Sequence, residues 1–238
     1  MDKNDSSAQS AVYNALRSNI MYLKLKPGTV ISAKEIAEKL NVSRTPVREA
    51  FIRLQRDGLL DIYPQKETVV SKIDFSKVEQ ERFVRESLEC ANIDLLMGKC
   101  TKKDFLQLEQ NIEMQRATVK NCDYNSLIKL DNDFHKYMFM ITNQSLSWEI
   151  IENRSNNYAR IRLVTIWDKD IMMATILQHQ KILSSLQEGD KDFAKSYISS
   201  HMHNLETQKP QLIKDYPDYF VIDSQSDEDR FKELLGGL

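Results

Sequence analysis

The hydrophobic positions of the chain recur mainly at helical spacing. In the N-terminal part, Val12, Leu16 and Ile20 predict a first helix over residues 8–23. Breaks at Lys26-Pro27-Gly28 and at Asn41 bound a short second helix from about residue 33. The pattern therefore begins with two helices of unequal length.

A third short helix follows and is expected to face a core with one side. Its apolar stripe consists of Val47, Ala50, Phe51 and Leu54. Ser43 is a suitable N-cap and Gly58 ends the helix. The β-prone runs Leu59 to Tyr63 and Thr68 to Lys72 then predict a hairpin, which would be the wing of a winged helix.

Beyond residue 75 the pattern changes to long helical segments with short links. They are expected near residues 76–98, 102–118, 123–141, 145–167, 170–187 and 190–208. Short links between six helices favour an antiparallel bundle. The predicted fold is therefore mainly α, with a winged helix-turn-helix over 8–73, an all-α bundle over 76–208, and a tail over 209–238 that is irregular until a short helix from Ser226 through Leu235.

The composition of the 238 residues is that of an ordinary globular protein, with 41% hydrophobic and 29% charged residues. No apolar run approaches the ~20 residues that span a bilayer, and the N-terminus lacks the apolar core of a signal peptide. Cys90, Cys100 and Cys122 form no CxxC pair. We expect reduced thiols in a cytoplasmic protein without a membrane partner.

Charge and spacing both indicate a DNA-binding N-terminal part. Residues 1–75 hold 12 Lys and Arg against 9 Asp and Glu, whereas the remainder holds 21 against 26. Arg44 and Arg48 are one helical turn apart, where guanidinium groups can reach guanine edges, and Thr45 and Lys34 can reach phosphate. The alternative is a basic, solvated helix in another small α domain.

This segment resembles the winged-helix domain of the GntR family of bacterial transcription regulators. The matching motifs are Pro27-Gly28, Glu35-Ile36-Ala37, Val42 to Ala50, Leu54 and Asp57-Gly58-Leu59. The resemblance implies that Lys34, Arg44, Thr45 and Arg48 face double-stranded DNA. One departure is Glu67, where the family usually has glycine at the wing, so wing contacts would shift to Gln65 and Lys66.

The histidine spacing suggests a metal site in the bundle. Asp131 and His135 are four residues apart and leave one helix face together. His179 and His201 are equally distant from residue 190, so folding back at the turn there brings them level. His203 would face solvent. One carboxylate and three imidazoles can bind a divalent metal, although buried histidines often only satisfy hydrogen bonds.

The same region resembles the FCD effector-binding domain of the FadR-like GntR subfamily. The matching positions are Arg85-x-x-x-Glu89, Asp131-x-x-x-His135, Asn143, His179, Gly189-Asp190, Ala194 and His201. The resemblance implies metal ligands at Asp131, His135, His179 and His201. By the same resemblance, Arg85 would pair either with an acid effector or with a core carboxylate, and Asn143 is a further effector candidate. Zinc is the first choice of metal, with nickel, manganese or iron as alternatives.

Arg160 and Arg162 are weaker effector candidates, because a lone arginine on a helix is more often a surface residue. The sequence thus predicts a homodimeric regulator that binds a palindromic operator. Its operator affinity would be controlled by a small carboxylate bound at a metal ion, and the resemblance implies a repressor, which is the commoner behaviour in the family. One rival is a metal-dependent enzyme, although the chain shows no nucleophile motif, partnered base or phosphate loop. Another rival is a purely structural metal.

Overall fold

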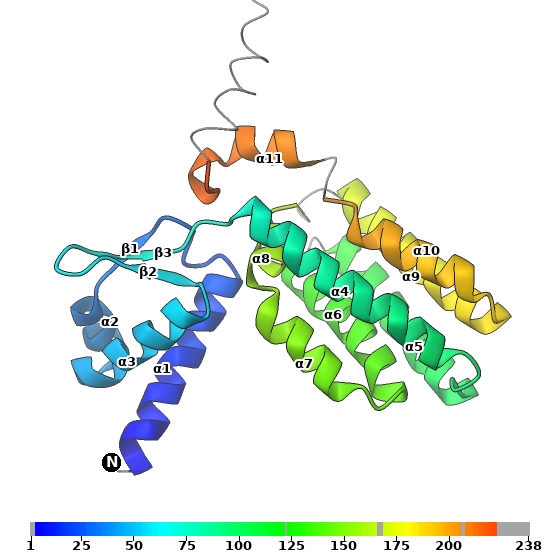
Figure 1. Cartoon of the computed structure of the whole chain (residues 1–238), viewed down its shortest axis with the longest axis horizontal. Coiled ribbons are helices and arrows are strands. Elements are labelled where there is room, and N and C mark those ends of the chain that lie inside the picture. The colour runs from blue at the N-terminus through cyan, green and yellow to red at the C-terminus, as the bar shows by residue number, and fades with distance from the viewer. Residues whose placement is uncertain (1–2, 122, 166–168, 206–207, 223–238) are drawn as a thin grey trace, which may run out of the picture.

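The structure is a computed structural model that describes residues 3–121, 123–165, 169–205 and 208–222. A small N-terminal lobe and a larger helical lobe lie side by side (Figure 1). The N-terminal lobe comprises α1 (Lys3–Met21), β1 (Val30–Ile31), α2 (Ala33–Leu40), α3 (Arg44–Arg56), β2 (Leu60–Ile62) and β3 (Thr68–Val70). This order of elements confirms the predicted winged helix-turn-helix.

The caps explain where α2 and α3 begin and end. The Ser32 side chain accepts a hydrogen bond from the Glu35 N–H, and Asn41 ends α2 in the left-handed conformation at φ 52°. Ser43 is the N-cap of α3, as predicted, but its side chain makes no capping bond. The third helical residue, whose N–H such a side chain often accepts, is Pro46, which has none.

The wing contains one strand more than the sequence predicts. β3 lies in the middle of the sheet and pairs antiparallel with both β2 and β1. The two-residue β1 was not expected, because so short a run carries no periodicity. The predicted apolar side of α3 is buried as expected, and it packs with α1 and the sheet in one core.

The helical lobe is the predicted bundle with two differences. It comprises α4 (Phe75–Leu96), α5 (Lys102–Lys120), α6 (Tyr124–Ile141), α7 (Ser145–Arg154), α8 (Asn156–Thr165), α9 (Lys169–Glu188) and α10 (Lys191–Met202). The single helix predicted over 145–167 is two helices divided at Ser155, and the one predicted to reach 208 ends at Met202. All the helices within the described ranges are too short or too polar to span a bilayer.

The segment after α10 is more ordered than predicted. Instead of an irregular stretch after residue 208, the chain forms α11 (Lys209–Asp215) and a 3-10 helix (Pro217–Tyr219). These residues lie above the junction of the two lobes (Figure 1). The short helix predicted from Ser226 through Leu235 lies outside the described residues.

Candidate metal centre and DNA-facing surface

The four residues expected to face DNA are all exposed. Lys34 lies in the first turn of α2, and Arg44, Thr45 and Arg48 lie at the start of α3. The helix dipole and free first-turn N–H groups at this exposed end favour phosphate. Burial of the opposite side of α3 leaves these side chains available to a groove.

The wing tip is also exposed and tightly turned. Gln65 has a positive φ of 59°, and the hairpin is closed by hydrogen bonds from the Tyr63 N–H to the Glu67 carbonyl and from the Lys66 N–H to the Tyr63 carbonyl. The side chains of Gln65, Lys66 and Glu67 are all accessible. The tip thus presents one cation and one carboxylate close together.

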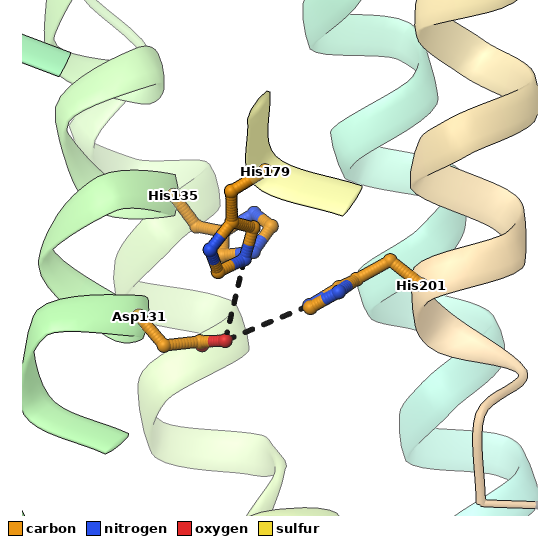
Figure 2. Close-up of side chains that lie close together, drawn as sticks. All are labelled: Asp131, His135, His179 and His201. Carbon is orange, nitrogen blue, oxygen red and sulfur yellow. Dashed lines mark ion pairs between the residues drawn. The ribbon is translucent and has the colours of Figure 1, made fainter. Parts of the chain in front are cut away.

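The four predicted metal ligands converge inside the bundle. Asp131 and His135 come from α6, His179 from α9 and His201 from α10 (Figure 2). All four are buried, and one potential ligand atom from each lies within 4.8 Å of the other three. Asp131 Oδ1 is 3.4 Å from His179 Nε2 and 3.6 Å from His201 Nε2. Three helices, two of which are joined by the turn at Gly189-Asp190, therefore bring one carboxylate and three imidazoles together.

Each imidazole is held from behind by a second side chain. His135 Nδ1 lies 2.5 Å from Glu89 Oε2, His179 Nδ1 lies 2.8 Å from Gln115 Oε1, and His201 Nδ1 lies 3.1 Å from Gln178 Oε1. Since these oxygens accept, Nδ1 donates and Nε2 is left as the electron-pair donor. Such partners fix the tautomer and ring orientation that a metal ligand requires.

The inward-facing atoms of the cluster lack ordinary partners. Asp131 Oδ1, His135 Nε2 and His179 Nε2 are buried without a hydrogen-bond partner among the described residues. A buried polar atom left unsatisfied costs about 1–3 kcal/mol. Several unsatisfied acceptors that converge on one point are the arrangement that a divalent cation would satisfy, so the donor set fits a metal.

The protonation states also suit a metal. Burial lowers the pKa of His179, and burial together with His179 lowers that of His201 well below the usual value, so both imidazoles are neutral. Burial opposes the charge of Asp131, but Arg162 and the histidines outweigh it and hold the pKa of this carboxyl well below its usual range. An ionised carboxylate beside neutral imidazoles is the form in which these groups bind a cation.

Two arginines border the cluster. Arg162, on α8, pairs with the outer oxygen Asp131 Oδ2 and donates to Asn132 Oδ1 at 3.0 Å. Arg85, on α4, donates to Glu89 at 2.7 Å and lies 3.9 Å from Asp131 Oδ2. The expectation that Arg162 lies on the surface was wrong, because its side chain is buried against the Asp131 carboxylate.

A cavity opens beside the cluster. It has a volume of about 30 Å³, and its lining includes Asp131, Tyr158, Arg162, Thr175 and His201. An arginine, hydroxyl groups, an imidazole and the Asp131 carboxylate thus line the same small space. A cavity of this size is far smaller than the several hundred Å³ that are typical of pockets for drug-sized ligands.

Two other sequence candidates lie away from this cavity. Arg160 is fully buried, which again contradicts the surface expectation, but its Nη1 donates to the Ser71 carbonyl at 2.6 Å at the junction of the lobes. Burial lowers the pKa of Arg160 to about 10.

Asn143 is exposed in the turn between α6 and α7 with a φ of 59°. His203, expected in solvent, is only half-exposed and lies 3.1 Å from Glu86.

Sequence reasoning missed the amides that position the imidazoles. Gln115 is fully buried on α5, and its Nε2 donates to Asn111 Oδ1 at 2.7 Å. Gln178 precedes His179 and exchanges hydrogen bonds with Asn204. Glutamine on a helix carries no spacing signal of its own. Its one sequence clue was that Gln115 falls on the apolar side of α5 with Leu108 and Ile112.

Comparison with known proteins agrees with both lobes. Residues 8–70 match the gntR family of bacterial regulatory proteins, and residues 82–204 match the FCD domain. The HTH-type transcriptional repressor RspR of Escherichia coli K12 is 32% identical over 209 residues, which cover 88% of this chain and 92% of that protein. The HTH-type transcriptional regulator McbR of E. coli K12 is 27% identical over 141 residues, which cover 59% of this chain and 64% of McbR.

Solved structures show the same fold at lower identity. E. coli McbR/YncC superposes with a TM-score of 0.68 at 21% identity, covering 88% of this chain and 98% of that one. A GntR-type protein of Rhodococcus sp. RHA1 gives a TM-score of 0.73 at 20% identity, covering 86% and 98%. With both family matches and the RspR similarity, the chain belongs to the GntR family of bacterial regulatory proteins, as a DNA-binding transcription regulator whose winged helix is followed by an FCD domain.

Proposed function

We propose that this regulator is a repressor whose operator affinity is set by a small carboxylate that binds beside a metal ion in the helical lobe. The observation that carries the proposal is the convergence of three Nε2 atoms and one carboxylate oxygen in a buried cluster. The cluster adjoins a cavity bordered by Arg162. Repression is proposed by analogy with the relative RspR, which is named a repressor.

The metal would be held by Asp131, His135, His179 and His201. A cation bound there supplies a Lewis acid with room for a further oxygen ligand, because four protein ligands leave positions open in a five- or six-coordinate ion. The ligand set is mixed nitrogen and oxygen, which zinc accepts, as do nickel, manganese and iron. The outer amides and Glu89 would keep the imidazoles aimed at it.

The chain's own residues favour an anion in the cavity. Arg162 lines the cavity, and both Arg162 and Arg85 have Asp131 as a counter-ion. The guanidinium carbon of each arginine is 5.8 Å from the centroid of the Tyr158 ring. An incoming carboxylate could draw Arg162 away from Asp131 Oδ2 or share it. The small volume of the cavity restricts the effector to a short organic acid.

Helix α8 offers a direct route from the cavity to the DNA-binding lobe. Arg162, which contacts Asp131, lies near the C-terminal end of α8. Asn156 lies six residues earlier in the same helix, about 9 Å along the helix axis. The Asn156 Nδ2 donates to the Asp57 carbonyl at 2.9 Å, at the C-cap of α3. Its Oδ1 accepts from Arg17 Nη2, on α1, at 3.3 Å. Movement of Arg162 would therefore displace Asn156, which holds the C-terminal end of α3, the recognition helix.

We also propose a homodimer that binds a palindromic operator. A two-fold dimer presents two recognition helices to half-sites about one DNA turn apart. Phe83 on α4 and Leu146 on α7 are each 67% exposed, and α7 packs against α4. These apolar side chains give the helical lobe surface that association could bury. Light scattering at micromolar concentration tests the dimer, and a monomer would contradict it.

The metal is tested by elemental analysis. Protein purified without chelator should carry about one equivalent of divalent metal. The double variant His179→Ala, His201→Ala should lose it while the winged helix stays folded. His203→Ala is the matched control, since this histidine lies outside the cluster. Full metal retention by the double variant would show that the ligands are assigned wrongly.

The effector class is tested by thermal shift. Short mono- and dicarboxylates are screened against metal-loaded protein, and a carboxylate that binds the cavity should raise the unfolding temperature. Arg162→Ala should abolish that rise. Were the metal purely structural, no carboxylate would stabilise the protein, and the metal-free chain would unfold. Were the cluster enzymatic, a carboxylate ester or amide would be turned over without DNA.

A further inference from the structure

Residues 209–222, which include α11 and the 3-10 helix, lie outside both family matches. We call this segment the strap. Its end pairs with the linker between the lobes through two backbone hydrogen bonds. The Ile73 N–H donates to the Tyr219 carbonyl at 2.8 Å, and the Val221 N–H donates to the Ile73 carbonyl at 2.9 Å. The strap thus adds a short parallel strand contact to the linker.

Side chains reinforce this backbone pairing. Phe220 is fully buried and stacks on Phe75, the first residue of α4, with ring centroids 4.8 Å apart. Lys209 Nζ lies 4.6 Å from the centroid of the Phe75 ring on the strap's other end. Two points of attachment therefore hold the strap across the place where the winged helix joins the bundle.

The strap is part of a core that joins the linker to the helical lobe. Its buried members come from the linker, α4, α8, α10 and the strap: Ile73, Val78, Tyr158, Ile161, Val164, Met202, Leu212 and Phe220. Leu23, directly after α1, packs against the same core. Burying this apolar surface fixes the linker and the start of α4 against the bundle, and the winged helix, which is attached to the linker, is positioned with them.

The strap also begins beside the candidate effector cavity. Asn204, Leu205 and Gln208 line that cavity, and α11 starts at the next residue, Lys209. Tyr158 belongs to both the cavity lining and the shared core. A change in the cavity therefore has a short path to the strap.

We propose that the strap is a positioning element that holds the winged helix at the angle required for simultaneous contact with two half-sites. This inference rests on the proposed function, in which a dimer reads a palindromic operator. Without the strap, the linker around Ile73 would be free to bend, and the effective concentration of the second winged helix at its half-site would fall. Contact of one winged helix with one half-site would not change.

The test compares two shortened chains. One ends at Gln208 and lacks the strap, and the control ends at Ile222, so it keeps the strap and loses only residues 223–238. Operator duplexes with both half-sites or with one are taken from the DNA that flanks the chain's own gene. We expect the chain ending at Gln208 to bind the two-site duplex about tenfold more weakly or worse, with unchanged single-site affinity. It should also tolerate inserted base pairs between the half-sites.

Point variants separate positioning from folding. Phe220→Ala removes the stacking on Phe75, Phe220→Leu keeps an apolar side chain, and Val221→Ala changes an exposed neighbour. Phe220→Ala should reduce the ratio of two-site to one-site affinity, Phe220→Leu should restore most of it, and Val221→Ala should leave it unchanged. Bound metal is measured in each to show that the bundle is folded.

The outcomes distinguish this inference from the function on which it rests. If the intact protein binds no duplex, the proposed regulation fails first. If it binds and the chain ending at Gln208 keeps the affinity ratio of the control, the strap has no positioning role. If the chain without the strap and Phe220→Ala both lose their bundle, the strap is a stability element, which also overturns the inference.

Discussion

At the scale of single residues, the cluster depends on which nitrogen of each imidazole faces inward. A histidine alone leaves this undecided, and the second side chain behind it makes the choice. Glu89, Gln115 and Gln178 each accept a hydrogen bond from an Nδ1–H, so three Nε2 atoms are directed to the same side. One of these partners is charged and two are neutral.

Replacing Gln115 with leucine should weaken metal binding while keeping the volume of the side chain. His179 would lose the acceptor that fixes its tautomer, and loss of such a partner typically costs 10–100-fold in metal affinity. Competition with a chromophoric chelator measures the affinity. Gln110→Leu, on the exposed side of the same helix, is the control. Equal affinity in both variants would show that the amide does not orient the ligand.

Stability of the chelator-treated protein should fall as the pH is lowered. The pKa values of His179 and His201 are below 6.5 in the folded state because of burial, whereas in the unfolded chain they are ordinary. Between these values the unfolded chain binds more protons, so the free energy of unfolding decreases below about pH 6.5. Urea unfolding across this range measures it, with His203→Gln as control. A flat profile would mean that neither imidazole is held neutral.

At the scale of elements, α8 and the wing are expected to have different roles, and the sequence pattern predicts neither role clearly. Nearly all of α8 is buried, and its polar residues bond to the winged helix, the linker and the cluster. The wing tip instead is exposed, and it carries the Glu67 carboxylate. We expect α8 to transmit effector binding to the winged helix, and the wing to tune the affinity for DNA.

Asn156→Ala should uncouple the lobes more than it destabilises them. Two hydrogen bonds, to the Asp57 carbonyl and from Arg17, would be lost, at a cost of about 1 kcal/mol each in stability. The change in operator affinity caused by a stabilising carboxylate should shrink. Asn153→Ala, an exposed asparagine on α7, is the control. Anisotropy titrations with operator duplex give the comparison, and an undiminished response in Asn156→Ala would exclude this route.

Glu67→Gly should strengthen DNA binding if the wing tip approaches phosphate. Removing one carboxylate near the backbone is worth roughly 1 kcal/mol, or about fivefold in affinity. Glu67→Gln removes the charge but keeps the side chain, so it separates repulsion from steric access. Affinity for operator duplex is measured at low and moderate salt. No change in either variant would place the wing away from DNA.

At the scale of the whole molecule, regular periodicity was predictable and irregular packing was not. The winged helix and the bundle follow from their apolar stripes, and the structure confirms that fold. The break at Ser155 was missed because serine interrupts no hydrophobic pattern. The strap was missed because its apolar residues lie in a short stretch that contains Pro210 and Pro217 and is too short to show a sustained helical period.

The candidate site was partly predictable for the same reason. The turn at Gly189-Asp190 allowed His179 and His201 to be matched by residue number, and the structure places their ring centroids 4.7 Å apart. The proximity of Arg162 to Asp131 depends on how α8 crosses α6, which no local pattern encodes. Metal binding by this cluster stays a prediction.

The central claim is that the cluster in the bundle controls the recognition helix in front of it. The most direct measurement is the affinity of metal-loaded protein for its operator duplex, with and without a saturating carboxylate chosen by thermal shift. The claim predicts that the carboxylate weakens operator binding by about 5–150-fold, the usual range of coupling between sites, and that Arg162→Ala removes the effect. Equal operator affinity at saturating carboxylate would contradict it.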